Sequence, residues 1–303
     1  AYTTEAMRLV HERVATPSQI DAIMRDCCGF RLGPLELADL TGVDVNYPVS
    51  QIIYQGYDQD PRLKTSFPHL SLLEAGRLGR KSGLGSYRYE GGKPVDVPSP
   101  DHVTAAAPAK SVMLVEPDEK LEAFAAQIGW TLLEEDDGEC PLIGFPLGED
   151  ATAFAIWTGA DPARLVCVDL TVETHSRVTL MAAPGADVAV IDAVAAAITT
   201  PARPVTLIKD SPGFVAQRIR GMIANLGCEM AQIGVATPAE IDLAMKLGLN
   251  YPSGPLELAE QMGLDDTLTI MENLQQVTGD DRYRPSQWLR RRALLGLPID
   301  TAD

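Results

Sequence analysis

The chain has 303 residues, of which 46% are hydrophobic and 22% charged. This composition is typical of soluble globular proteins, and the length allows two or three domains with their own cores. The formal net charge of −17 argues against nucleic acid or an anionic membrane as the main partner, because both require a basic surface. No apolar run reaches membrane-spanning length, and five cysteines without paired spacing predict reduced thiols in the cytoplasm and no metal site.

The first predicted elements are helices. The chain begins with the helical pattern AYTTEAMRLVHERV at 1–14, which is typical of a fragment of a longer protein. Thr16 then precedes a proline and stands three residues before Gln19, the spacing of a capping box, so TPSQID opens a second helix. A third helix begins at Gly33-Pro34, and its leucines 35, 37 and 40 do not share one narrow face, which predicts a well-buried helix.

The next stretch changes character. Residues 91–110 are rich in Pro, Ala and Gly and lack periodicity, so they predict a linker. After it, alternating apolar runs and amphipathic stretches predict a small parallel α/β sheet. We expect strands at 111–117, 131–136, 151–159, 164–172 and 203–210, with helices at 118–130 and 185–200.

The first predicted strand has no glycine-rich turn after it. A dinucleotide-binding domain needs GxGxxG at this point so that backbone N–H groups can approach a pyrophosphate. The chain instead has Glu116-Pro117-Asp118, which places two acids where phosphates would lie. We therefore expect that this α/β region binds no dinucleotide in the usual way.

The sequence contains a long internal repeat. Shifted by 221 positions, residues 14–44 match residues 235–265 at 15 of 31 positions, including VATP, ID and GPLELA. Chance would give about 2 identities at ordinary residue frequencies. We interpret the repeat as a duplicated helical domain with other structure between the copies.

These motifs resemble the 3-hydroxyacyl-CoA dehydrogenase family. The stretches IKDSPGFVAQRI (208–219) and ATPAEIDLAMKLGLNYPSGPLELAEQMGLD (236–265) are similar to the family's C-terminal helical domain. The first copy adds GRKSGLGSYRY (79–89), similar to the segment that closes that domain. The layout resembles long bacterial members, in which one Rossmann domain precedes two helical copies, and it implies that the middle segment is a degenerate Rossmann domain.

The family's catalytic residues are not preserved in this part of the chain. The resemblance places Asp169 at the position of the family's histidine, Met181 at that of its glutamate and Gln217 at that of its asparagine. The histidine takes the hydroxyl proton while hydride leaves for NAD, and the glutamate orients the imidazole. We therefore expect these three positions to be vestigial and this region to have no catalytic residue.

The first copy implies functional residues of another kind. Its catalytic Rossmann domain, with bound NAD, would precede Ala1, so no cofactor is expected in this chain. Candidates for lining the acyl-CoA cleft are Arg31, Gly33, Pro34 and Lys81, although the turns they form also start or stabilise structure. Three arginines at 290–292 are interpreted as an exposed helix face.

The sequence thus predicts a mostly α, α+β protein. We expect one helical domain at 1–95, a linker at 96–110, a degenerate Rossmann-like α/β domain at 111–207 and a second helical domain at 208–303. The predicted function is the C-terminal portion of an NAD-dependent, cytoplasmic 3-hydroxyacyl-CoA dehydrogenase of fatty-acid or aromatic-acid degradation, which supplies a cleft wall and a homodimer contact. The alternatives are a non-catalytic binding or assembly module and, less consistent with KDSPGF and KSGLGSY, a reductase of the 6-phosphogluconate type.

Overall fold

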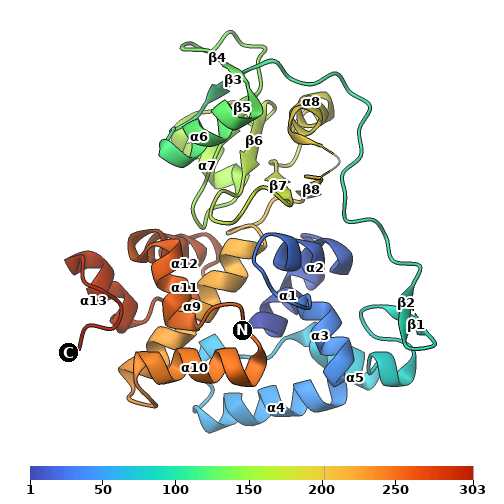
Figure 1. Cartoon of the computed structure of the whole chain (residues 1–303), viewed down its shortest axis with the longest axis vertical. Coiled ribbons are helices and arrows are strands. Elements are labelled where there is room, and N and C mark those ends of the chain that lie inside the picture. The colour runs from blue at the N-terminus through green and yellow to red at the C-terminus, as the bar shows by residue number, and fades with distance from the viewer. Residues whose placement is uncertain (201, 303) are drawn as a thin grey trace.

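The computed structural model describes residues 1–200 and 202–302. About half of the described residues are helical, in helices α1–α13, and six strands form one mixed sheet. Figure 1 shows an α/β unit stacked on a broad layer of helices, with an extended segment running from β2 up to β3. None of the helices in the described part of the chain combines the length and apolar character needed to cross a membrane.

The first helical unit comprises residues 1–95. Its helices begin at the predicted signals: Thr16 accepts the N–H of Gln19 and the Gln19 side chain accepts the N–H of Thr16, which completes the expected capping box. The helices are α1 (Tyr2–His11), α2 (Pro17–Asp26), α3 (Pro34–Thr41), α4 (Val43–Gly56), η1 (Pro61–Leu63), α5 (Phe67–Glu74) and η2 (Arg80–Ser82).

A hairpin follows these helices. Strands β1 (Arg88–Glu90) and β2 (Lys93–Val95) pair antiparallel around Gly91 and Gly92, which both have positive φ. The prediction of linker from residue 91 was therefore wrong for this part, because a Gly-Gly pair also favours a tight hairpin turn. Residues 96–110 contain no helix or strand and run past the α/β unit, where the N–H of His102 donates to the carbonyl of Val205 at 2.7 Å.

The α/β unit has a six-stranded sheet in the order β4-β3-β5-β6-β7-β8. All its pairs are parallel except β6 with β7. Its elements are β3 (Ser111–Leu114), α6 (Glu119–Ile128), β4 (Thr131–Leu132), β5 (Leu142–Gly144), α7 (Ala151–Thr158), β6 (Leu165–Val168), β7 (Val178–Met181), α8 (Val188–Ile198) and β8 (Val205–Ile208).

The predicted strand at 151–159 was wrong, because these residues form α7. The apolar run hid both helix ends. Asp150 accepts the N–H of Ala153 as N-cap, and Gly159 takes the left-handed conformation that ends a helix. Two short strands, β5 and β7, were also missed, and β7 introduces the antiparallel pair that the predicted parallel sheet lacked.

The second helical unit repeats the order of the first. Thr237 and Glu240 form the second predicted capping box, and Gly254 precedes the helix that begins with Pro255. The helices are α9 (Ala216–Gln232), α10 (Pro238–Leu249), α11 (Pro255–Met262), α12 (Leu264–Thr278), η3 (Asp281–Tyr283) and α13 (Gln287–Leu295). Helices α1 and α9 pack against each other and join the two units.

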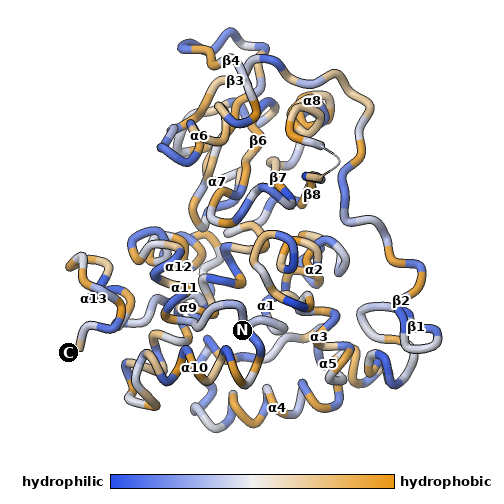
Figure 2. Tube along the Cα trace, in the orientation of Figure 1, coloured by the Kyte–Doolittle hydropathy of each residue, from blue (hydrophilic) through white to orange (hydrophobic). Residues whose placement is uncertain are grey.

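Two apolar clusters hold the fold together. One spans both helical units and one face of the sheet, and the other lies between the opposite face and helices α6 and α8. Strand β6 serves both, because Leu165 and Cys167 lie in the first cluster while Val166 and Val168 lie in the second. This strand is correspondingly hydrophobic in Figure 2. The α/β unit is therefore fixed on the helical layer by shared core packing.

Candidate functional site

The repeated GPLELA turns have a structural basis that is the same in both units. Asp21 accepts hydrogen bonds from the backbone N–H groups of Leu35 and Glu36 at 2.8 and 3.0 Å. These two N–H groups have no partner within α3, because they lie in its first turn. A Cβ on Gly33 would lie 2.2 Å from the Cβ of Asp21. The carboxylate can therefore reach the helix only because residue 33 is glycine.

The second unit reproduces this arrangement. Asp242 accepts the N–H groups of Leu256 and Glu257 at 2.8 and 3.1 Å, and a Cβ on Gly254 would again lie 2.2 Å from the aspartate. The Asp and the Gly of each unit are part of the identities found under the shift of 221 residues. This common contact explains why those letters match.

The predicted cleft-lining residues lie at different places in the first unit. Gly33 and Pro34 are buried at the start of α3, where both serve the helix. Arg31 is exposed and forms no hydrogen bond or ion pair with the described residues. The Lys81 ammonium pairs with the carboxylate of Asp44 at the start of α4. Only Arg31 of the four presents a charged group without a protein partner.

The closing segment of the first unit is held by a second aspartate. Asp39 on α3 accepts the N–H groups of Ser86 and Tyr87, each at 2.9 Å, and the hydroxyl of Tyr89 at 3.1 Å. The prediction that α3 is a well-buried helix was wrong at Leu40, which is 48% exposed. The helix instead buries Leu35 and Asp39. Asp39 can be buried because the closing segment offers it the backbone N–H groups of Ser86 and Tyr87.

Two of the three predicted vestigial positions meet below the sheet. Asp169 follows β6 and is fully buried, and its Oδ1 accepts the side-chain amide of Gln217 on α9 at 3.1 Å. The same oxygen accepts the hydroxyl of Thr171 at 2.7 Å. Burial raises the pKa of Asp169, opposed by these hydrogen bonds. The pair joins the α/β unit to the second helical unit.

Met181 is buried at the end of β7, where its sulfur accepts the N–H of Ser211. Gln217 also donates to the carbonyl of Pro146 and accepts the N–H of Gly148 at 2.8 Å. All three positions therefore have internal partners. A thioether carries no charge and cannot orient an imidazole, and an amide that is bonded on both sides offers no further group for proton transfer.

The turn after β3 does not suit a nicotinamide dinucleotide. Asp118 is the N-cap of α6 and accepts the N–H of Leu121 at 2.8 Å, so it occupies the position where a pyrophosphate would receive such N–H groups. Glu116 has a positive φ of 49° and is exposed beside it. Both carboxylates would repel a phosphate, so no step of NAD chemistry is assigned to this turn.

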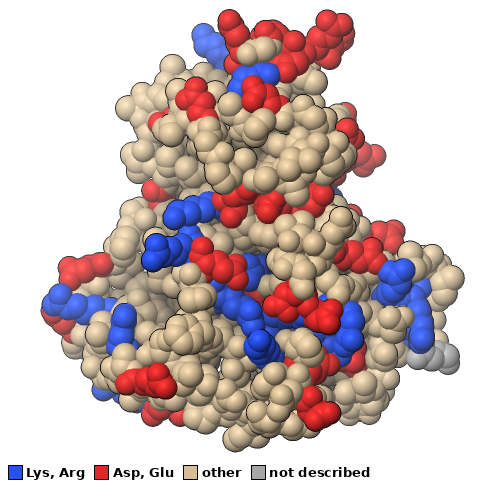
Figure 3. Space-filling model, turned by 180° about the vertical axis from the view of Figure 1, so that it is seen from behind, with Lys and Arg blue, Asp and Glu red and all other residues tan. Residues whose placement is uncertain are grey.

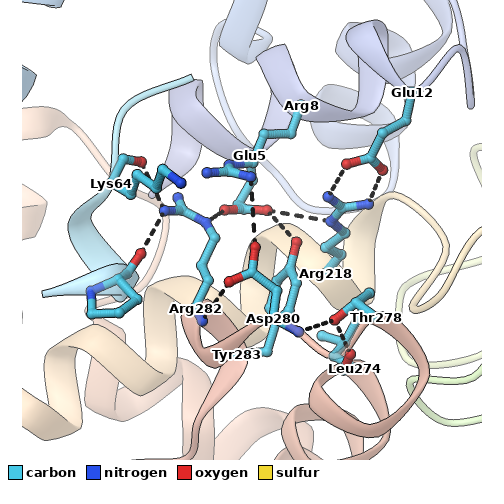
Figure 4. Close-up of polar contacts among 11 residues, drawn as sticks. Glu5, Arg8, Glu12, Lys64, Arg218, Leu274, Thr278, Asp280, Arg282 and Tyr283 are labelled. Carbon is cyan, nitrogen blue, oxygen red and sulfur yellow. Dashed lines mark hydrogen bonds and ion pairs between the residues drawn. The ribbon is translucent and has the colours of Figure 1, made fainter. Parts of the chain in front are cut away.

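A buried ion network was missed by sequence reasoning (Figure 4). Glu5 on α1 is fully buried and pairs with Arg218 of α9 at 3.3 Å and with Arg282 of η3. The hydroxyl of Tyr283 donates to Glu5 at 3.1 Å, and Arg218 also binds Glu12 at 2.6 Å. Burial opposes ionisation, but the arginines outweigh it and lower the pKa of Glu5 to about 2.

A related contact also connects the two helical units. Asp60 and Asp280 each accept the N–H of the arginine two residues later, Arg62 or Arg282. Arg62 of the first unit reaches Glu229 on α9 at 2.7 Å, just as Arg282 of the second unit reaches the first. The repeated D-x-R spacing was the only sequence signal for these exchanges.

The interpretation of residues 290–292 as an exposed face was wrong for one of the three. Arg292 is 3% exposed, lies over the ring of Trp288 and donates to the carbonyl of Thr301. Its helix α13 turns this side chain toward the C-terminal segment because Arg292 follows Trp288 by four residues. Arg290 and Arg291 are exposed.

One group of potential metal ligands lies outside these sites. Asp136, Asp137 and Cys140 have ligand atoms within 4.8 Å of one another. Arg164 pairs with Asp136 at 2.6 Å, and Asp137 accepts the N–H of Cys140 at 2.7 Å. These partners account for the cluster without an ion. Figure 3 shows acidic side chains prominent at the end of the α/β unit, and acidic and basic side chains intermixed over the helical layer.

Comparison with known proteins identifies the family. The family model for the 3-hydroxyacyl-CoA dehydrogenase C-terminal domain matches residues 1–89 and again residues 213–298. These two segments cover more than half of the chain. The chain therefore belongs to the 3-hydroxyacyl-CoA dehydrogenase family, as its motifs indicated.

Individual relatives agree with this result. The chain is 37% identical over 294 residues to the 3-hydroxyadipyl-CoA dehydrogenase of Escherichia coli strain K12, covering 97% of this chain and 57% of the relative. It is 51% identical over 88 residues to a probable 3-hydroxybutyryl-CoA dehydrogenase of Deinococcus radiodurans, covering 29% of this chain and 32% of the relative.

A solved structure resembles nearly the whole chain. The crystal structure of a 3-hydroxybutyryl-CoA dehydrogenase from Escherichia coli K12 matches with a TM-score of 0.76 and 34% identity, covering 97% of this chain and 58% of that one. The chain thus spans little more than half the length of its long relatives and about a third of the Deinococcus one.

Proposed function

We propose that this chain supplies the C-terminal part of an NAD-dependent 3-hydroxyacyl-CoA dehydrogenase, which oxidises 3-hydroxyacyl-CoA to 3-oxoacyl-CoA in the cytoplasm during fatty-acid or aromatic-acid degradation. The family match at 1–89 and 213–298 carries this proposal. The long E. coli relative, named for 3-hydroxyadipyl-CoA, supports this substrate class because its similarity extends over 97% of the chain.

In this proposal the helical units form a wall of the acyl-CoA cleft, and NAD and the proton-transfer residues belong to a domain that precedes Ala1. The absence of a histidine at these positions supports the division: Met181 carries no base, and the Gln217 amide is bonded on both sides. The acidic turn at Glu116 and Asp118 supports it as well. The exposed guanidinium of Arg31 is then available to substrate, whereas Lys81 would first have to leave Asp44.

The test compares the chain alone with the same chain joined to a preceding Rossmann-type domain of a long relative. NADH formation from 3-hydroxybutyryl-CoA is measured for both, and acyl-CoA binding is measured by calorimetry. We expect no turnover from the chain alone and turnover from the fusion. Turnover by the chain alone would contradict the assignment. A fusion that shows no turnover and does not bind acyl-CoA would favour a non-catalytic assembly module.

We also propose a homodimer through the helical units. Within one chain the α1–α9 face is already covered, so a second copy would have to use another helical surface. Light scattering on the purified chain at several concentrations tests this directly. A mass of one chain at all concentrations would refute the homodimer, while a mass of two chains would support it.

A further inference from the structure

A small pocket lies where the α/β unit and both helical units meet. Its polar lining comes from Arg220 on α9, Thr171 and Glu173 after β6, Cys28 at the end of α2, Ser253 before α11 and Gln261 on α11. Its volume of about 230 Å³ is below the usual size of a pocket for a drug-sized ligand and far too small for acyl-CoA.

Arg220 is the unusual member of this lining. Arg220 is 9% exposed, and its Nη1 donates to the carbonyl of Thr171 at 2.6 Å. Among the described residues it forms no other hydrogen bond and no ion pair. A guanidinium has five N–H donors, and burying its charge without a carboxylate is costly, so such groups are usually paired.

The neighbouring acids form no ion pair with this charge. Glu173 is exposed and accepts the N–H of Ser176 at 2.9 Å. Asp169 is bonded to Thr171 and Gln217 through Oδ1 only, and its buried Oδ2 has no hydrogen-bond partner. Burial raises the pKa of Asp169 and the Arg220 charge opposes that rise, but the two side chains do not form a direct contact. Burial raises the pKa of Cys28 to about 12, so this thiol is neutral at physiological pH. The chain has 42 acidic residues, yet none of the described ones lies within ion-pair distance of Arg220.

Two further lining residues can supply hydrogen bonds to a ligand. The Gln261 side-chain amide donates to the Ser253 hydroxyl at 3.0 Å, and this bond is exposed. Both groups can donate to an oxygen when they turn toward Arg220. A planar guanidinium together with hydroxyl and amide donors in one pocket matches the chemistry of a carboxylate or phosphate.

We propose that the Arg220 pocket, defined by these six residues, binds a small oxyanion, either a carboxylate or a phosphate, between the three units. The ligand completes the charge pairing of Arg220 and connects α9 to the start of α11. This site is independent of the function proposed above, because it requires neither NAD nor acyl-CoA.

The experiment is isothermal titration of the full chain with inorganic phosphate, and separately with acetate and succinate, at neutral pH and constant ionic strength. We expect saturable binding of at least one of these anions at one site per chain. Comparison of the three titrations shows whether the site prefers phosphate or a carboxylate. Arg220→Gln should weaken this binding at least about tenfold, because a charged hydrogen bond is lost. Arg291→Gln, the same change on an exposed arginine, should leave it unchanged.

A second variant tests the pocket without removing Arg220, in case Arg220→Gln does not fold. Gln261→Glu keeps Arg220 in place but adds a carboxylate to the pocket, so it should abolish anion binding while the circular dichroism and melting temperature stay near the parent values. Gln55→Glu, on the exposed side of α4, adds the same charge far away and should bind normally. No saturable binding by the parent chain, or equal weakening by Gln261→Glu and Gln55→Glu, would overturn the proposal.

Discussion

The hydroxyl of Tyr87 donates to Asp21 Oδ2 at 2.6 Å. This bond connects the closing segment of the first helical unit to the helix start that both units share. In the second unit no hydroxyl of the described residues donates to Asp242, which accepts only the two backbone N–H groups of α11. The shared contact therefore has an additional partner in the first unit only.

Tyr87→Phe should make the stability of the chain more sensitive to pH. Burial raises the pKa of Asp21 from 3.8 to about 7, against the opposing hydrogen bond from Tyr87. A carboxyl group whose pKa is higher in the folded chain than in the unfolded chain stabilises the fold fully below the unfolded pKa. This stabilisation is lost as the pH rises through the folded pKa, here between about pH 4 and pH 7. Without the hydroxyl the pKa rises further, and we expect a loss of about 1–2 kcal/mol above pH 7.

Urea unfolding of Tyr87→Phe at several pH values measures this loss, and the carboxyl carbon resonance of Asp21 reports its titration. Tyr57→Phe, on a side chain that is 48% exposed, serves as control. A loss that is the same at pH 5 and pH 8 would show that the hydroxyl does not act through ionised Asp21.

Glu5→Gln should destabilise the fold by about 3–5 kcal/mol, because it leaves two buried guanidinium groups, of Arg218 and Arg282, without their shared carboxylate. Glu12→Gln removes a carboxylate that is 42% exposed and should cost about 1 kcal/mol or less. The free energies of unfolding in urea at neutral pH test the difference. Equal losses in the two variants would contradict the importance assigned to Glu5.

The lowered pKa of Glu5 also predicts that the fold loses stability in acid. Its pKa is lowered to about 2 from 4.5, so its stabilising contribution is complete above about pH 4.5 and is lost as pH falls toward 2. We expect the stability difference between the parent chain and Glu5→Gln to shrink over this range. A difference that stays constant from pH 6 to pH 3 would exclude Glu5 as the titrating group.

The sequence predicted what depends on neighbouring residues. Both capping boxes and both GPLELA helices need only residues within one turn, so Thr16, Gln19 and Gly33 were sufficient to place them. The network around Glu5 depends on partners that are 213 and 277 residues away in the chain, and no local pattern encodes such a pairing. The helix α7 was missed for the converse reason: its apolar run fits a strand as well as a buried helix, and only its caps decide.

The identities at Gly33 and Gly254 lead to a last prediction. Gly254→Ala would place a Cβ 2.2 Å from the Cβ of Asp242, so either the aspartate or the start of α11 must move. We expect a loss of about 1–3 kcal/mol, the usual cost of overpacking, together with weaker protection of the Leu256 and Glu257 amides from hydrogen exchange. Gly248→Ala is the matched control, because a Cβ added to Gly248 in α10 would point into open space, with nothing beyond its own stretch of helix within 4 Å. It should stabilise the chain by up to about 1 kcal/mol; if both alanines had the same effect, close approach of Asp242 could not be the reason for the glycine.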